Sequence, residues 1–250
     1  MEIVGKTYSN FTWQNETLGA AQAVAKGDQG HLADLGLRLG LKGYPREVNH
    51  NGEVLAKSAL QYIETHDHSR FIANFGVLSR DNDLLAEGDR RKWYAVQPYL
   101  IGIFTSPGVP FLWQGQELGE NYVIPDQGWG RVMLFRPVRW DYFYDPVGKV
   151  LVGLVRKLVK LRRGLPQLRQ GDHYFYNHYD RYQTHNVLIF SRRLGNDFTL
   201  VAINFGPEDQ RVPFAFPLGG NYREELHGLD DPGINLQDVT PGVDQWITVP

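Results

Sequence analysis

The sequence of 250 residues contains no cysteine. A disulfide framework and a thiolate metal site are therefore excluded. No stretch approaches the roughly 18 uninterrupted apolar residues of a membrane-spanning helix, and the start MEIVGKTYSN lacks the pattern of a signal peptide. The net charge of −2, from 26 basic and 28 acidic residues, gives no field that would hold nucleic acid or an anionic membrane. We expect a cytoplasmic protein without a cofactor, whose partner is small or neutral.

What the sequence does contain is apolar and aromatic side chains. Hydrophobic residues make up 42% of the chain, enough to bury a sizeable core. Aromatic residues make up 13%, and the 13 Tyr and 6 Trp combine an apolar body with a polar group. Such side chains fill cores and also form surfaces on which sugars or bases stack.

Strand and helix signals alternate along the first two thirds of the chain. Short apolar runs predict strands at 2–4, 60–64 and 109–117. Helical composition or periodicity predicts helices at 17–26, 31–41, 87–104 and 146–163. The segment 41–53 is rich in Gly, Pro and Asn, and it is predicted to be a loop. This alternation is typical of an α/β fold with a parallel sheet.

A different pattern begins at Asp172. HYFYNHYDRYQ, NVLIFSRR, FTLVAINFG, QRVPFAFP and QWITVP are short apolar or alternating runs separated by turn residues. They predict an antiparallel β domain. The chain is therefore expected to divide near residue 165, into an α/β portion at 1–164 and an all-β sandwich at 165–250.

The stretch YIETHDHSRF, residues 62–71, carries two histidines, two carboxylates and an arginine behind an apolar run. Barrel enzymes gather their active-site residues at the carboxyl ends of their strands, so this position favours a site. One hypothesis is a metal centre in which His66 and His68 bind the ion with Asp67 or Glu64. Another is an ionic network in which Asp67 pairs with Arg70, with no ligand involved.

A third hypothesis comes from a family resemblance. YIETHDHSRF resembles the fourth conserved motif of the α-amylase superfamily of glycoside hydrolases, in which an Asn-His-Asp sequence is followed by arginine three places on. GVPFLWQGQELGE (108–120) is similar to that family's eighth barrel strand, and LVKLRRGLPQLRQG (158–171) to its last barrel helix. The resemblance implies the carboxy-terminal half of a TIM-type (β/α)8 barrel, about strands 5 to 8, followed by the family's β domain.

The resemblance also implies roles for individual residues. In this family the motif histidine and aspartate bind hydroxyls of the sugar that is cleaved, which assigns substrate binding to His66 and transition-state stabilisation to Asp67. Thr65 departs from the usual asparagine. Further expected sugar contacts are Arg70, Trp113, Gln116 and Glu117, with Trp129 or Trp140 as stacking surfaces.

Two catalytic groups of the family are not found. Gly36-Leu37-Arg38-Leu39-Gly40 mimics the setting of the nucleophile, but glycine replaces the aspartate and the surroundings are helical. EIVGKTYS (2–8) has the shape of the strand that precedes the general acid, yet Lys6 occupies the acid's place. An ammonium group is a poor proton donor to a glycosidic oxygen. Alternatively, the acid lies upstream of Met1.

Three functions remain open at this point. The leading one is an α-glucan-active glycoside hydrolase or transglycosidase with a retaining mechanism, catalytically incomplete as this chain, acting on starch, glycogen or maltooligosaccharide. The second is a non-catalytic glucan-binding or interaction protein, which Lys6 favours. The third is a metal-dependent hydrolase. Because a half-barrel leaves open sheet edges, we expect a truncated product, a partner chain that supplies the missing half, or self-association.

Overall fold

The computed structural model describes residues 2–78, 86–124, 129, 135–228 and 234–250. Its α-helices are α1 (Glu2–Lys6), α2 (Asn15–Ala25), α3 (Leu32–Leu39), α4 (Gln97–Thr105), α6 (Pro146–Gly164) and α7 (Gln167–Gln170). Its 3-10 helices are η1 (Gln29–His31), η2 (Phe71–Phe75), η3 (Arg90–Val96), η4 (Gln116–Leu118), η5 (Trp140–Tyr144) and η6 (Gln183–His185). None of the described helices is long and apolar enough to cross a membrane.

The strands before residue 165 are short. They are β1 (Phe11–Trp13), β2 (Glu47–His50), β3 (Glu53–Ala56), β4 (Ser58–Gln61), β5 (Val77–Leu78), β6 (Glu87–Gly88) and β7 (Val109–Pro110). Strand β4 lies between β1 and β7, and both pairings are parallel, in a sheet of three strands. The predicted parallel sheet is therefore present. Pairs β2–β3 and β5–β6 are antiparallel hairpins.

The strands after residue 165 are all antiparallel, as predicted. They are β8 (Asp172–Phe175), β9 (Val187–Leu194), β10 (Asp197–Asn204), β11 (Gln210–Ala215), β12 (Gly220–Tyr222), β13 (Leu236–Val239) and β14 (Asp244–Val249). Strand β9 is the centre of the sheet β10-β9-β8, while β11 pairs with β14 and β12 with β13. Strands β12 and β13 were not predicted from the sequence.

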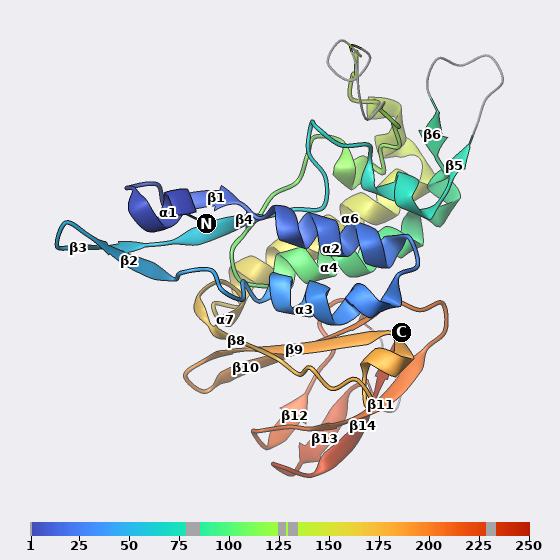
Figure 1. The fold of residues 1–250 in the computed structure, drawn as a ribbon. Helices are drawn as coiled ribbons and strands as arrows, with labels where there is room; N and C mark the ends of the chain where they lie inside the picture. The colour runs from blue at the N-terminus through green and yellow to red at the C-terminus, as the bar shows by residue number, and fades with distance from the viewer. Residues whose placement is uncertain (1, 79–85, 125–128, 130–134, 229–233) are drawn as a thin grey trace.

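Strand β9 joins the two portions of the chain because both of its faces are buried. Leu188 and Phe190 belong to the core that includes residues of α2, α3, α4 and α6. Val187 and Ile189 belong to a second core, with Val212 and other residues of β11 and β14. Successive side chains of a strand point to opposite faces, so one strand serves two cores. Figure 1 shows helices α2, α3 and α4 above this sheet and strands β11 to β14 below it.

Four sequence predictions differ from the structure. The strand predicted over 109–117 is present only as β7, Val109–Pro110, and residues 116–118 form the 3-10 helix η4. Residues 2–4 lie in helix α1 and not in a strand. The predicted loop at 41–53 contains β2 and the start of β3. The helix predicted over 87–104 is α-helical only from Gln97, because residues 87–88 pair with β5 and residues 90–96 form a 3-10 helix.

Candidate functional site

The candidate site lies where the parallel sheet ends. Because β1, β4 and β7 are parallel, the segments that follow them lie along the same edge of the sheet. The segment after β4 begins at Tyr62, whose hydroxyl donates to the Asn15 side chain in the segment after β1. The Tyr62 ring also meets the rings of Trp13 and Phe111 edge-on. These contacts tie the three strand ends together.

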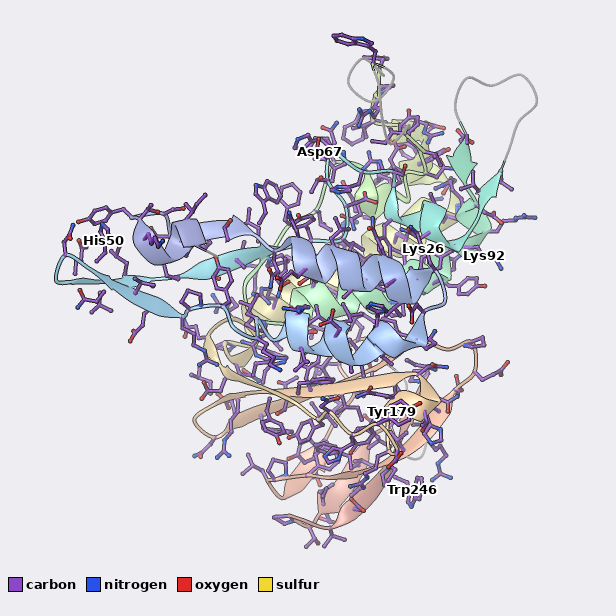
Figure 2. The ribbon with its side chains drawn as sticks, in the orientation of Figure 1. Lys26, His50, Asp67, Lys92, Tyr179 and Trp246 are labelled. Atoms are coloured by element: carbon purple, nitrogen blue, oxygen red, sulfur yellow. The ribbon has the colours of Figure 1, made fainter. Side chains whose placement is uncertain are left out.

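His66 and Asp67 project from this edge. Their side chains are 59% and 57% exposed, and His66 Nε2 lies 3.4 Å from Asp67 Oδ2. The His66 ring is 5.6 Å from the Trp113 ring, which comes from the segment after β7. Arg136 donates to the His66 carbonyl oxygen at 2.7 Å. The imidazole, the carboxylate and the indole thus form one accessible polar and aromatic surface. Figure 2 labels Asp67.

Beneath this surface, Glu64 and Arg70 form a buried ion pair. Arg70 Nη1 donates to Glu64 Oε1 at 2.9 Å, and the side chains are only 4% and 2% exposed. Glu64 Oε2 accepts from the Phe71 backbone N–H at 2.6 Å. Burial raises the pKa of the Glu64 carboxyl, and the Arg70 guanidinium opposes that rise. The pair closes the loop that carries His66 and Asp67.

Arg70 also joins this loop to its neighbours. Its Nη2 donates to the Gln114 carbonyl oxygen at 2.7 Å, and its backbone N–H donates to the Tyr122 carbonyl oxygen. Two expectations for Arg70 are therefore wrong. It pairs with Glu64 and not with Asp67, and its guanidinium is buried in the protein instead of facing a sugar.

The contacts of the other motif residues give the metal hypothesis no support. His68 Nδ1 is 2.8 Å from the Thr65 hydroxyl, and Glu64 is held by Arg70. Within the described ranges, no group of three or more His, Cys, Asp or Glu side chains could hold a metal ion.

The predicted residues after β7 have different surroundings. Trp113 and Glu117 are half-buried, and Trp113 lies beside His66. Gln116 is buried, and its Oε1 accepts from the Trp113 backbone N–H at 3.3 Å. Its Nε2 has no hydrogen-bond partner in the described part of the chain. Gln116 therefore supports the turn that carries Trp113, and its predicted sugar contact stays a prediction.

Lys6 does not occupy the position that the sequence suggested. It is the last residue of helix α1, whereas the strand beside β4 is β1, Phe11–Trp13. The prediction that Lys6 follows a barrel strand is therefore wrong. Glu16 lies closer to the end of β1, but its carboxylate pairs with Arg38. Arg38 is helical, as the sequence indicated, so its segment does not form the nucleophile's strand.

Sequence reasoning missed a charged network behind the β7 loop. Arg139 pairs with Glu120 at 3.0 Å and with Glu87 at 2.7 Å, and it also donates to Asn121. Its guanidinium lies 4.0 Å from the centre of the Tyr122 ring. The partners are scattered between residues 87 and 139, so no local pattern in the sequence indicates them.

Trp129 and Trp140 are both largely exposed. Their indole faces are therefore open to solvent, as a stacking surface requires. Among the ring contacts of the described residues, none joins either indole to His66.

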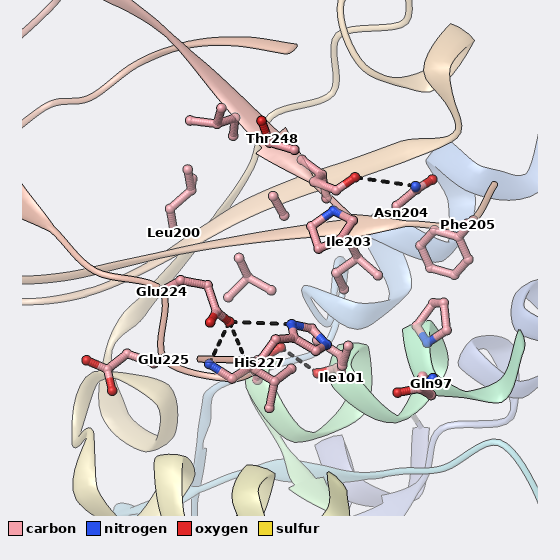
Figure 3. A pocket seen from close by; sticks show the side chains of 18 of the residues that line it. Gln97, Ile101, Leu200, Ile203, Asn204, Phe205, Glu224, Glu225, His227 and Thr248 are labelled. Carbon is pink, nitrogen blue, oxygen red and sulfur yellow. Dashed lines mark hydrogen bonds and ion pairs between the residues drawn. The ribbon is translucent and has the colours of Figure 1, made fainter. Parts of the chain in front are cut away.

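Figure 3 shows a separate cavity of about 1010 Å³ between helix α4 and strand β10. Ile101, Leu200 and Ile203 contribute apolar side chains to it, and Glu224 and His227 contribute polar ones. None of the predicted sugar contacts is among the described residues that line this cavity. It is therefore distinct from the His66–Asp67 surface.

Comparison with known proteins shows which class of protein the chain resembles. The chain is similar to glycoside hydrolases of the α-amylase superfamily, which confirms the resemblance seen in its motifs. More particularly, residues 179–245 match the family described as alpha amylase, C-terminal all-beta domain. The chain is 27% identical over 195 residues to the α-amylase MalA of Haloarcula japonica, covering 77% of this chain and 24% of that protein. It is 26% identical over 151 residues to a cyclomaltodextrin glucanotransferase of Bacillus sp. (strain 1011), covering 60% and 18%.

Solved structures show the same fold. The α-amylase from Geobacillus thermoleovorans, complexed with acarbose, aligns with a TM-score of 0.61 at 20% identity, over 96% of this chain and 46% of that chain. AmyP in complex with maltose aligns with a TM-score of 0.65 at 13% identity, over 96% and 50%. The chain thus spans about a quarter or less of these curated relatives and about half of these solved structures.

Proposed function

We propose that the chain is the glucan-contacting part of an α-amylase-type glycoside hydrolase or transglycosidase with a retaining mechanism. The observation that carries the proposal is the exposure of His66 and Asp67 at the end of the central parallel strand, beside Trp113. A carboxylate that accepts hydrogen bonds from ring hydroxyls binds more strongly as the ring flattens toward an oxocarbenium-like transition state. Trp113 offers an apolar ring beside His66.

In this proposal β1, β4 and β7 are neighbouring strands of a (β/α)8 barrel, and further strands complete it. The outer strands β1 and β7 pair only with β4, and neither has a second strand partner among the described residues. We propose that the open edges of this sheet are covered by a further polypeptide segment or by a second copy of this chain. Because the chain itself offers no recognised nucleophile or general acid, we expect little turnover from it alone.

The test is incubation of the purified chain with a series of maltooligosaccharides, followed by measurement of reducing ends and products. The Asp67→Asn variant removes the charge at the site, and Asp197→Asn, at the exposed start of β10, is the matched control. Binding without turnover, weakened only by Asp67→Asn, supports the proposal. Turnover that Asp67→Asn abolishes would show that the chain has a complete site. If the chain shows no binding and no turnover, the proposed function is contradicted.

The second candidate is a glucan-binding protein without catalysis. The observation that favours it is that neither Glu64 nor Glu16 is available as a second carboxylate beside Asp67, since Glu64 is buried in its pair with Arg70 and Glu16 pairs with Arg38. Mixing the purified chain with the amino-terminal barrel half of a relative distinguishes the two candidate functions. Restored turnover supports an enzyme part, whereas unchanged binding with no turnover supports a binding protein.

A further inference from the structure

A second aromatic surface lies on the β domain, far from Asp67 in Figure 2. Trp246 is on β14, and its side chain is on the outer face of the β11–β14 pair. The burial pattern establishes this, because Ile247 and Val249 of β14 and Val212 and Phe214 of β11 are in the core. Trp246 is 56% exposed. Its cross-strand partner is Pro213, so the indole stands on a paired strand next to a proline ring.

A lone exposed tryptophan carries little information, because single apolar side chains are common on protein surfaces. The polar groups around Trp246 make this position more specific. Arg181 donates to Asp244 Oδ1 at 2.8 Å and to the Pro213 carbonyl oxygen at 3.3 Å. Asp244 lies on the same face of β14 as Trp246, two residues away. We call Trp246, Pro213, Arg181 and Asp244 the Trp246 patch.

The Trp246 patch is held in place from below. The neighbouring Tyr182 is buried, and its hydroxyl donates to the same Pro213 carbonyl oxygen at 3.0 Å. The hydrogen bond to Asp244 raises the pKa of Arg181, so the guanidinium keeps its charge opposite the carboxylate. Arg181 and Asp244 are 37% and 51% exposed, which leaves polar atoms available beside the indole. The patch therefore needs little reorganisation to bind a ligand.

The chemistry of the patch fits a flat, neutral and amphipathic ligand. One indole amid polar residues is much smaller than the roughly 800 Å² that a stable protein interface covers on each partner. The paired charges of Arg181 and Asp244 give no net attraction for an ion. A pyranose ring has an apolar C–H face for the indole and hydroxyls at its edge for the carboxylate and guanidinium.

We propose that the Trp246 patch binds glucosyl units of an α-glucan at a distance from the His66–Asp67 surface. The ligand class rests on the proposed function, whereas the position rests on the patch itself. Two separate contacts on one chain would raise the affinity for long glucans more than for short ones, since the second contact becomes intramolecular.

The test measures binding of maltoheptaose by titration calorimetry to Asp67→Asn protein, in which the first surface is impaired. Adding Trp246→Val removes the planar ring but keeps a good strand former, so the β11–β14 pair is preserved. We expect roughly tenfold weaker binding, which corresponds to about 1.4 kcal/mol. Trp246→Phe, which keeps a flat ring, should lose less. Tyr144→Ala, another largely exposed aromatic position, is the matched control and should change nothing.

Three further results decide the matter. Unchanged maltoheptaose affinity in Trp246→Val, with an unchanged thermal transition, would overturn the proposal. So would the loss of concentration-dependent self-association in that variant without an effect on sugar binding, because the patch would then be a protein contact. If Asp67→Asn alone abolishes all glucan binding, the proposed function stands and the Trp246 proposal fails.

Discussion

Replacing Arg70 by methionine tests whether the buried ion pair holds the sugar-binding loop. The change leaves the Glu64 carboxylate, 2% exposed, with the Phe71 N–H but without its cation, and it leaves the Gln114 carbonyl oxygen without this donor. Breaking a buried pair from one side costs about 3–5 kcal/mol. We expect a fall of that size in the free energy of unfolding, measured by urea denaturation. The burial that raises the pKa of Glu64 is the reason for the cost.

The double variant Glu64→Gln/Arg70→Met separates charge from packing. A neutral amide can still accept from the Phe71 N–H, so the double variant should be more stable than Arg70→Met alone. A double-mutant cycle should give a coupling of at least about 2 kcal/mol. Arg91→Met is the control, because Arg91 pairs with Asp89 while 81% exposed, and exposed ion pairs contribute little to stability. If Arg70→Met costs no more than Arg91→Met, the reasoning is refuted.

Two further stability predictions follow from buried positions. Burial, with a smaller effect from Arg192, lowers the pKa of His173 to about 3, so the unfolded chain binds more protons below its ordinary pKa of about 6.5. Unfolding free energy should therefore fall by about 2 kcal/mol between pH 7.5 and pH 5 on account of this group, and His173→Phe should remove that part of the slope in urea titrations. Gly115 has φ of 84°, and an added Cβ would lie 2.4 Å from Glu120 Cγ. Gly115→Ala should thus lower the free energy of unfolding by roughly 1 kcal/mol or more, and the thermal midpoint should fall with it. Gly153→Ala in helix α6, where a Cβ meets nothing within 4 Å, should raise it, and equal effects of the two changes would be evidence against this reading.

Long, strongly patterned segments were predictable from the sequence. Helix α6 has one apolar stripe, Pro146 at its start and basic residues in its last turn, and it ends at Gly164 as expected. The strands β8, β9, β10, β11 and β14 all lie in the runs that the sequence indicated. The predicted boundary near residue 165 stays a prediction, as does the cytoplasmic location. Residues of β9 and β10 share a core with the helices, so packing does not stop at that boundary.

Short segments were not predictable with the same success. In the β2–β3 hairpin, Asn51 and Gly52 both have positive φ, which is the geometry of a type I′ turn. The Asn-Gly pair was therefore a signal for a hairpin, although the segment was predicted as a loop. At residues 2–4, Val4 is buried while Ile3 is exposed, and the Thr7 hydroxyl donates to the Ile3 carbonyl oxygen. Two apolar residues cannot distinguish that helical turn from a strand.

The site was predicted in part. The two motifs placed His66, Asp67 and Trp113 at strand ends, and the structure brings the His66 and Trp113 rings to 5.6 Å, while their roles in sugar binding stay predictions. The sequence did not reveal that Arg70 pairs with Glu64, since two carboxylates lie within six residues of that arginine. The choice between them depends on burial, which only the folded chain defines.

The central claim is that Asp67 binds a sugar, and one measurement tests it most directly. Maltoheptaose binding is measured by calorimetry in a Trp246→Val background, so that only the first surface contributes. We predict saturable binding that Asp67→Asn weakens by roughly tenfold, since a charge-assisted hydrogen bond is lost, while Asp197→Asn leaves it unchanged. Equal affinity with and without Asp67→Asn would contradict the account.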